Sequence, residues 1–285
     1  MKLKQPVALV TGASSGIGKA TAERLVTAGY KVYGTSRRAA VPGHGPFEML
    51  SLDVTSDASV EAAVNALLRS EGRIDLLVNN AGFSVALAGD EESSVEQAWS
   101  IFDTNFLGTV RMTRAVVAHM RGQGGGRIIN IGSLLGFLPM PFMAVYAASK
   151  HAIEGYSESL DHELRTRGIR VLVVEPGVTK TQFDANLLEP DSTVDEYRDV
   201  RAALAKRWQD IAARGDQPGT VADVVLKAAK AVRPKLRYPV GRVASMRMLR
   251  RFAPAAVVDA AVRKNLRLDA PVALPRAATS GFSGS

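Results

Sequence analysis

The chain has 285 residues, with 36 lysines and arginines against 28 aspartates and glutamates, and its formal net charge is +8. It contains no cysteine, which excludes disulfide bonds, thiolate zinc sites and cysteine nucleophiles. Hydrophobic residues make up 46% of the chain and charged residues 22%, values that are typical of a globular protein and exclude a disordered or fibrous one. The basic balance admits nucleic acid, acidic ligands or a membrane surface as partners.

Short apolar runs alternate with helical patterns from the N-terminus to Glu175. In chain order, the expected elements are a strand at 6–10, a helix at 17–28, strands at 31–35 and 47–52, a helix at 59–70, a strand at 74–78, a helix at 95–121, a strand at 127–131, a helix at 145–167 and a strand at 169–174. Continuous apolar strands joined by helices predict a parallel sheet that is covered on both faces. The predicted fold class is therefore α/β, with a single Rossmann-type doubly wound sheet.

We expect one domain over 1–285, with a core at about 1–232, a basic C-terminal extension at about 233–269 and a flexible tail at 270–285. No apolar run approaches the roughly 20 residues that are needed to cross a bilayer. The run from Val7 to Val10 stops at Thr11, whereas the apolar part of a signal peptide needs about 7–15 residues. We therefore expect a cytoplasmic protein.

A glycine-rich turn joins the first strand to the first helix, with the spacing Gly-x-x-x-Gly-x-Gly from Gly12 to Gly18. Glycines at such a turn let the backbone approach a pyrophosphate, which binds at the amides of the helix N-terminus. By itself the turn is also compatible with an ordinary loop, but its place after the first strand favours a dinucleotide site. The expected contacts within the turn are Gly12, Ser14, Ser15, Gly16, Ile17 and Gly18.

The end of the second strand discriminates between cofactors. NAD-selective sites usually place an acidic residue there for the ribose 2′-hydroxyl, whereas arginine accommodates a 2′-phosphate. Here the strand ends at Ser36, Arg37 and Arg38, with no carboxylate nearby to repel the phosphate. NADP(H) is therefore favoured over NAD(H), with Ser36 and Arg37 as contacts; in the alternative interpretation both arginines are solvated surface residues.

Tyr146 and Lys150 lie four residues apart at the start of a predicted helix, which places them on one face. A nearby ammonium favours the phenolate and lowers the pKa of a tyrosine from its ordinary value of about 10. Such a tyrosine can exchange a proton with a carbonyl or alcohol oxygen while a nicotinamide moves the hydride. The alternative is a helix-surface pair, but Ser133, at the carboxyl end of a predicted parallel strand, favours an active site.

With these residues in place, the chain resembles a classical short-chain dehydrogenase/reductase. Five motifs carry the resemblance in the family's order: Thr11–Gly18, Asn79–Gly82, Asn105–Gly108, Tyr146 with Lys150, and Pro176–Thr181. The segment at 32–37 and the long C-terminal extension also resemble the subgroup of 17β-hydroxysteroid dehydrogenases and retinol dehydrogenases. The family pairs the helices expected at 95–121 and 145–167 between subunits, which implies a homodimer or homotetramer.

The resemblance also implies a role for each matched residue. Tyr146 would be the general acid/base, Ser133 would orient the substrate oxygen, and Lys150 would bind the nicotinamide ribose and lower the tyrosine pKa. Asn105 would hold a water that continues the proton relay. Asn79 would be mainly structural. The implied cofactor contacts are Asp53, Val54, Asn80, Ala81, Gly82, Tyr146, Lys150, Pro176, Gly177, Val178 and Thr181.

The loop from Leu134 to Met143 is apolar, carries no charge and lies between Ser133 and Tyr146. We therefore expect part of it to line the substrate pocket, which favours a hydrophobic ketone or alcohol. In the alternative, several of these side chains pack between subunits or under the next loop. The family resemblance further implies a substrate lid over about 183–215.

The remaining features support other functions weakly or not at all. The four histidines form no pair with metal-ligand spacing, so no metal is expected, and Asp161 and Glu163 are interpreted as solvated helix charges. The nucleic-acid alternative has no supporting motif. A catalytically silent NADP(H)-binding scaffold or sensor of the same fold is kept as an alternative, although four intact active-site residues disfavour it.

The basic charge is concentrated near the C-terminus, where residues 233–267 contain ten lysines and arginines and one acid. Val243, Met246, Leu249 and Phe252 are spaced as in an amphipathic helix. This helix either covers the substrate pocket, the simpler interpretation, or makes a peripheral contact with an anionic membrane.

Overall fold

The computed structural model describes residues 5–37, 45–181 and 187–266. Arg38, the first residues of the expected lid from Phe183 and the expected tail at 270–285 lie outside these ranges. The strands are β1 (Val7–Val10), β2 (Lys31–Ser36), β3 (Glu48–Ser51), β4 (Leu76–Asn79), β5 (Gly126–Ile131), β6 (Ile169–Glu175) and β7 (Arg237–Pro239). The α-helices are α1 (Gly16–Thr27), α2 (Asp57–Glu71), α3 (Val95–Phe102), α4 (Gly108–Gly122), α5 (Ala144–Leu164), α6 (Arg198–Ala213), α7 (Pro218–Lys230), α8 (Val243–Phe252) and α9 (Ala255–Leu266).

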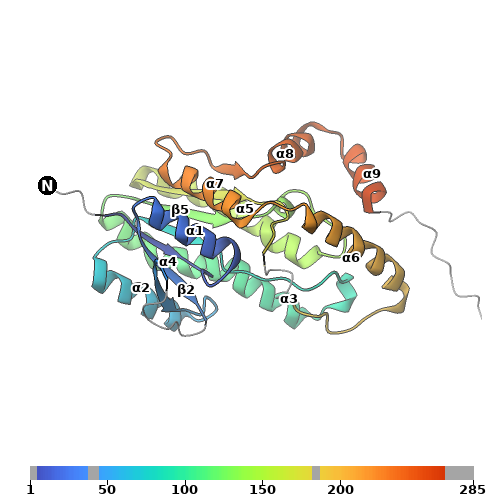
Figure 1. Cartoon of the computed structure of the whole chain (residues 1–285), viewed down its shortest axis with the longest axis horizontal. Helices are drawn as coiled ribbons and strands as arrows, with labels where there is room; N and C mark the ends of the chain where they lie inside the picture. Colours follow the sequence, from blue (N-terminus) through green and yellow to red (C-terminus); the bar gives the residue numbers. More distant parts are fainter. Residues whose placement is uncertain (1–4, 38–44, 182–186, 267–285) are drawn as a thin grey trace, which may run out of the picture.

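The strands form one parallel sheet in the order β3-β2-β1-β4-β5-β6-β7. The chain runs outward from β1 to β3 and then returns to β4 on the other side of β1. This reversal leaves the carboxyl ends of β1 and β4 side by side, the position at which open α/β sheets bind their ligands. The predicted doubly wound α/β fold is confirmed (Figure 1).

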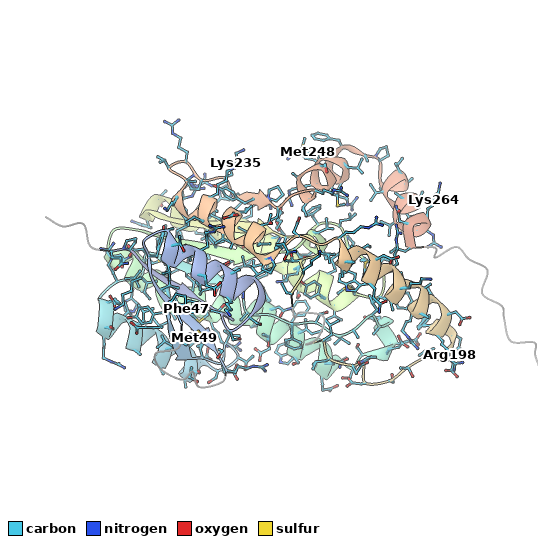
Figure 2. The ribbon with its side chains drawn as sticks, in the orientation of Figure 1. Phe47, Met49, Arg198, Lys235, Met248 and Lys264 are labelled. Atoms are coloured by element: carbon cyan, nitrogen blue, oxygen red, sulfur yellow. The ribbon has the colours of Figure 1, made fainter. Side chains whose placement is uncertain are left out.

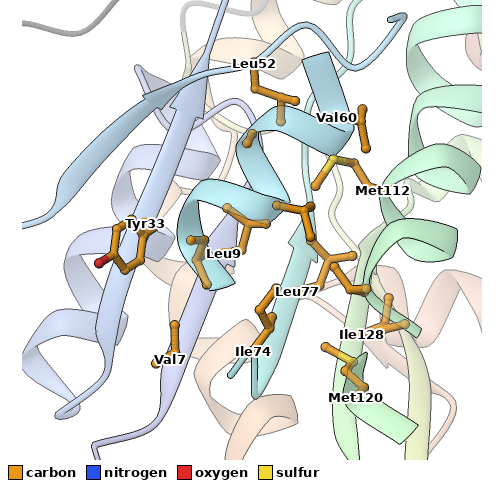
Figure 3. Packing of buried hydrophobic residues seen from close by; sticks show 14 of the residues in the cluster. Val7, Leu9, Tyr33, Leu52, Val60, Ile74, Leu77, Met112, Met120 and Ile128 are labelled. Atoms are coloured by element: carbon orange, nitrogen blue, oxygen red, sulfur yellow. The ribbon is translucent and has the colours of Figure 1, made fainter. Parts of the chain in front are cut away.

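The central strands β1 and β4 are buried at every residue, which explains why they are almost continuously apolar. On one face of the sheet, α2 and α4 pack against Leu9, Leu77 and Ile128, all completely buried (Figure 3). On the other face, α1 and α7 lie side by side and cover alternate residues such as Val10 and Val78 (Figure 1). Each fully buried large aliphatic side chain stabilises the fold by about 1.5–3 kcal/mol.

The helix predicted at 95–121 is present as one unbroken helical run over 95–122, but its hydrogen-bond pattern changes partway along. It divides into α3 and α4, which are joined by a π-helical turn over Asp103–Leu107. The apolar spacing continues through this turn, so the sequence pattern contains no sign of it. The turn buries Asn105, and such π-helical turns occur often at functional sites.

The interpretation of Asp161 as a solvated charge is wrong. Its carboxylate is buried at the end of α5 and accepts hydrogen bonds from Arg170 Nε (2.8 Å), the Val171 amide (3.0 Å) and Arg165. Because Arg170 and Val171 belong to β6, Asp161 joins the helix that carries Tyr146 to the neighbouring strand. Glu163, by contrast, is exposed as expected.

The sheet continues into the predicted C-terminal extension. After α7, β7 pairs with β6 as the edge strand, and α8 and α9 follow at the margin of the molecule (Figure 1). The expected core boundary near residue 232 therefore falls before the last strand of the sheet. Within the described ranges, no helix is both long and apolar enough to cross a membrane, and no group of three or more histidines, aspartates or glutamates is arranged to hold a metal ion.

Candidate active site

The glycine-rich turn after β1 has a backbone that side chains would block. Gly12 and Gly16 have positive φ angles of 65° and 55°, a conformation that favours glycine. A Cβ atom on Gly18 would collide with the Gly12 carbonyl and lie 2.5 Å from the Asn80 amide nitrogen. Glycine is therefore required for the close approach of this turn to helix α1.

Thr11 and Asn80 fasten this turn to the end of β4. The Thr11 hydroxyl accepts hydrogen bonds from the backbone amides of Asn80 (2.9 Å) and Ala81 (3.0 Å). In return, the Asn80 side-chain amide donates to the carbonyls of Thr11 (2.9 Å) and Gly12 (3.1 Å). The Asn80 side chain thus shapes the cofactor turn from within, and Thr11 is a positioning residue that the site prediction did not include.

The N-terminus of α1 suits an anionic ligand. Its N-cap residue Ser15 makes no side-chain capping bond, and the first turn carries no acidic residue. The amides and the positive end of the helix dipole are therefore available to a phosphate group. Ser14 is exposed and Ile17 half-buried beside this turn, and Gly16 faces Thr181, whose Cβ lies 3.3 Å from the position of an added Cβ. These residues fit a dinucleotide pyrophosphate.

Arg37 lies exposed at the end of β2, directly after the half-buried Ser36. No carboxylate was expected near Arg37, but Asp53, just after the adjacent β3, is within electrostatic reach of it. Hydrogen bonds from the amide (2.9 Å) and hydroxyl (2.7 Å) of Thr55, aided by Arg37 and Arg111, lower the pKa of Asp53. Val54 is buried and packs closely on Gly108.

Ser133, Tyr146 and Lys150 meet at the carboxyl end of β5. Ser133 forms a side-chain hydrogen bond with Tyr146, and Lys150 Nζ lies 5.7 Å from the centroid of the Tyr146 ring. The ammonium donates a hydrogen bond to the Ile131 carbonyl (2.9 Å), which anchors α5 on β5. The structure thus brings Ser133, predicted from the end of a strand, together with Tyr146 and Lys150, predicted from their spacing on a helix.

The charge states of this pair differ from the expectation that Lys150 lowers the tyrosine pKa. Burial raises the pKa of Tyr146 to about 12, although the hydrogen bond from Ser133 acts in the opposite direction. Burial also lowers the pKa of Lys150 to about 8. Desolvation penalises the charged form of each group and is the largest cause of both shifts. The protonated, neutral tyrosine is therefore the stable form at neutral pH.

Asn105 holds the loop that follows β4. Its side chain accepts a hydrogen bond from the Phe83 amide (2.9 Å) and donates to the Phe83 carbonyl (2.9 Å) and to Ser149 Oγ (3.3 Å). Gly82 packs against this side chain. Ser149 in turn donates to the Tyr146 carbonyl (2.8 Å), so Asn105 connects the loop at Ala81–Phe83 to the start of α5. The proton-relay role of Asn105 stays a prediction.

Asn79 has the structural role expected of it. Its amide donates to Asn130 Oδ1 (2.9 Å) and Thr113 Oγ1 (3.3 Å), all three residues being buried between β4, β5 and α4. This network lies inside the core and not at the site.

The segment after β6 forms one wall of the site. The Pro176 carbonyl accepts a hydrogen bond from the Leu134 amide (2.8 Å), which connects this segment to the Ser133 loop. The Val178 carbonyl accepts from the Asp216 amide (3.0 Å), and Gly177 packs against Val243 of α8. Contacts with the Ser133 loop, with the connection between α6 and α7, and with helix α8 therefore fix the position of this segment.

A pocket opens beside Tyr146. Its apolar lining includes Val85, Ile101, Phe142 and Met143, and its polar lining includes Asp90. Ser84, Val85, Ala86, Ala88, Gly89, Asp90, Ser93, Ile101, Phe142, Met143, Ala144, Val145 and Tyr146 form the whole lining.

The predicted substrate loop therefore contributes its last residues to the pocket. Leu135 is buried in a small cluster with Met143 and Ala147, against which Tyr146 and Trp208 pack. The rings of Phe142 and Tyr197 pack edge to face, with 5.5 Å between their centroids. Because Tyr197 belongs to the region predicted as a lid, that region lies against the pocket lining.

A cluster of four charged residues lies behind the site and was not predicted. Glu175, the last residue of β6, is completely buried and pairs with Arg247 of α8. Glu154, one turn after Lys150 on α5, accepts a hydrogen bond from Arg237 Nε (2.8 Å) and lies 3.9 Å from Arg247. Its members come from α5, β6, β7 and α8, so no sequence spacing reveals it.

Because Glu175 is buried next to Glu154, the unfolding free energy of the protein is expected to depend on pH. Burial, with the repulsion of Glu154, raises the pKa of Glu175 to about 8, against the attraction of Arg247 and Arg237. Between about pH 5 and 8 the folded protein thus retains a proton that the unfolded chain has lost, so its unfolding free energy falls as the pH rises.

We expect Glu175→Gln to flatten this slope, which is at most about 1.4 kcal/mol per pH unit for one proton. Urea unfolding across this pH range measures it. Glu158→Gln is the matched control, because Glu158 pairs with the same Arg237 but is half-exposed and has a lowered pKa. Equal slopes in the parent and in Glu175→Gln would contradict the prediction.

Comparison with known proteins agrees with this geometry. The family described as short chain dehydrogenase matches residues 6–192. A 3-ketodihydrosphingosine reductase of Bacteroides thetaiotaomicron is 37% identical over 84% of this chain and 89% of its own. The human 17-beta-hydroxysteroid dehydrogenase type 1 is 36% identical over 83% of this chain and 77% of its own.

The structural similarity is equally broad. A short-chain dehydrogenase from Streptomyces avermitilis superposes with a TM-score of 0.76 at 30% identity, covering 94% of this chain and 98% of its own. A serine dehydrogenase in complex with NADP+ superposes with a TM-score of 0.70 at 28% identity, covering 82% of this chain and 94% of its own. The fold, the order of its motifs and these relatives together show that the chain belongs to the short-chain dehydrogenase family of oxidoreductases.

Proposed function

We propose that this oxidoreductase uses NADP(H) to interconvert a carbonyl and an alcohol, with Tyr146 as the general acid/base. The observation that carries the proposal is the meeting of Ser133, Tyr146 and Lys150 beside a pocket at the carboxyl edge of the sheet. In the direction of reduction, the Tyr146 hydroxyl gives its proton to the carbonyl oxygen, which Ser133 orients by a hydrogen bond. In oxidation the same proton returns.

The nicotinamide, when bound, supplies or accepts the hydride at the carbon atom. The glycine turn at Gly12–Gly18 and the N-terminus of α1 hold the pyrophosphate, and Lys150 holds the nicotinamide ribose. The segment at Pro176–Thr181 would contact the nicotinamide end. Asn105 connects the Phe83 loop to the start of α5. A catalytically silent scaffold would need the cofactor contacts but not Asn105, Ser133, Tyr146 and Lys150 together.

The preference for NADP(H) depends on Arg37. Structural neighbours are known in complex with NADP+ and with NADH, so the fold itself does not select the cofactor. The Arg37 guanidinium lies exposed beyond the end of β2, where a 2′-phosphate would bind, and is suited to a bidentate phosphate contact. Asp53 is engaged by Thr55, which leaves Arg37 for the ligand.

We expect this protein to bind NADPH more tightly than NADH, and Arg37→Ala to weaken NADPH binding by about 10- to 100-fold, because a charge-assisted hydrogen bond contributes about 1.5–3 kcal/mol. NADH binding should change little. Fluorescence titration of both cofactors measures the effect, with Arg69→Ala, an exposed arginine on α2, as the control. Equal affinities for the two cofactors in the parent would overturn the preference.

We infer a hydrophobic substrate from the pocket lining, in which Val85, Ile101, Phe142 and Met143 surround Tyr146. The curated relatives are named for ketodihydrosphingosine, a hydroxysteroid and retinol. An NADPH-consumption screen should therefore give a kcat/KM at least about tenfold higher for long-chain ketones or steroid ketones than for short polar carbonyls. A preference for the polar members would contradict the inference.

Two further expectations concern the oligomeric state of the protein and its location in the cell. A homodimer or homotetramer through the helices at 95–121 (α3 and α4) and 145–167 (α5) stays a prediction, and light scattering on the full chain measures it. A cytoplasmic location likewise stays a prediction.

A further inference from the structure

Helix α8 is fixed in its rotation by the contacts of its inner face. Val243 is buried against Gly177, next to the end of β6. One turn later, Arg247 pairs with the buried Glu175, and its guanidinium lies 4.8 Å from the centre of the Phe137 ring in the Ser133–Tyr146 loop. The inner face of α8 therefore does lie against the substrate loop, as the simpler sequence interpretation expected, but it does so through Arg247 and Val243.

Two of the four apolar side chains expected on this helix, Leu249 and Phe252, point the other way, and so does Met248. Met248, Leu249 and Phe252 are 58%, 61% and 70% exposed. On a helix with 3.6 residues per turn they lie opposite the face that Val243 and Arg247 occupy. Val257 of α9 is 56% exposed, and Met248 on α8 and Lys264 on α9 lie at the same margin of the molecule (Figure 2).

The surroundings of these side chains are strongly basic. Between residues 242 and 266 there are six lysines and arginines and one acid, Asp259. Arg247 points inward to Glu175 and Glu154, whereas Arg250 and Arg251 are exposed in the turn that carries Leu249 and Phe252. An exposed apolar stripe that is bordered by cations is the pattern of a helix lying in a membrane interface, where apolar side chains enter the lipid and cations meet anionic headgroups.

We propose that the outer face of α8 and α9, centred on Met248, Leu249 and Phe252, rests on an anionic lipid membrane. A second copy of this chain is a poorer occupant, because a two-fold contact would bring the cations of both copies together. A nucleic acid is poorer as well, because the side chains of Met248, Leu249 and Phe252 offer no hydrogen bond to phosphates or base edges. The proposal is independent of the cofactor and substrate proposed above.

The contacts of the inner face of α8 place a bound membrane close to the loop between Ser133 and Tyr146. Because Arg247 contacts Phe137 and Glu175, a membrane bound to the outer face of α8 lies one helix away from the substrate loop.

Sedimentation of the full chain with extruded vesicles tests the proposal. We expect the protein to sediment with vesicles of phosphatidylcholine and phosphatidylglycerol in a 7:3 ratio, and at least tenfold more weakly with pure phosphatidylcholine. Binding to the anionic vesicles should fall in high salt. The triple variant Met248→Ser, Leu249→Ser, Phe252→Ser should lose at least tenfold in vesicle affinity, and Arg250→Gln with Arg251→Gln should lose affinity for the anionic vesicles alone.

Two control variants change the same kinds of side chain elsewhere. Val95→Ser with Trp99→Ser removes exposed apolar side chains from α3, and Lys206→Gln with Arg207→Gln removes exposed cations from α6. Both should bind vesicles as the parent does. Urea unfolding of each variant confirms that its fold is kept.

Three results would overturn the proposal: a parent that does not bind anionic vesicles, a triple serine variant that binds as well as the parent, or a triple variant whose only change is a smaller oligomer by light scattering. The last result would assign the face to a subunit contact. NADPH turnover on a water-soluble carbonyl, measured without vesicles, keeps a failure of this proposal distinct from a failure of the proposed reaction.

Discussion

Tyr146→Phe is expected to lower kcat for carbonyl reduction by about 10²- to 10⁴-fold, the range that general acid/base catalysis contributes. The substitution removes only the hydroxyl that hydrogen-bonds to Ser133 and leaves the ring beside Lys150 and the pocket. Because the proton for the substrate oxygen comes from this hydroxyl, the chemical step loses its acid. NADPH affinity should change less than about threefold, since the glycine turn and Arg37 are untouched.

NADPH consumption and fluorescence titration measure the two effects separately. The control is Tyr156→Phe on the same helix, whose hydroxyl hydrogen-bonds to Thr113 on α4, away from the pocket. A Tyr146→Phe protein that keeps more than about a tenth of the parent kcat would contradict the assigned role. A parent that binds NADPH but turns over no carbonyl in the screen would favour a catalytically silent scaffold.

The core of the fold was predictable because its physical signals are local. Strands buried on both faces are continuously apolar, and α1, α2 and α5 carry a regular apolar spacing, so their positions agree with prediction to within a few residues. The elements that were not predicted have weaker signals. Strand β7 has three residues and ends in Pro239, and α6 has a single buried residue, Leu204.

The site was predictable in its residues but less in its energetics. Ser133, Tyr146 and Lys150 follow from a strand end and a helix spacing, both of which are local. The raised pKa of Tyr146 and the lowered pKa of Lys150 follow from burial, which depends on the packing of the whole domain. Glu175 and Arg247 are 72 residues apart and meet only because α8 returns to the end of β6.

Asp161 shows most clearly how tertiary contacts override a sequence pattern, and it gives the largest expected effect on stability. Burial alone would raise the pKa of this carboxyl, but hydrogen bonds from Arg170, Arg165 and the Val171 amide outweigh burial and lower it. The stability that Asp161 contributes is therefore present above the ordinary aspartate pKa and is lost as the pH falls through the lowered value.

Asp161→Ala is expected to lower the unfolding free energy at pH 7 by about 3–5 kcal/mol, because removing one member of a buried ion pair leaves its partners without compensation. Arg170 would keep its charge in a largely buried position, and the Val171 amide would lose its acceptor. Urea unfolding at fixed pH measures the change, with Glu163→Ala on the same helix as the control, expected within about 0.5 kcal/mol of the parent. A loss below about 1 kcal/mol for Asp161→Ala would mean that water replaces the carboxylate at Arg170. In that case α5, and with it Tyr146 and Lys150, would be held in place mainly by apolar packing and the Lys150 contact with Ile131.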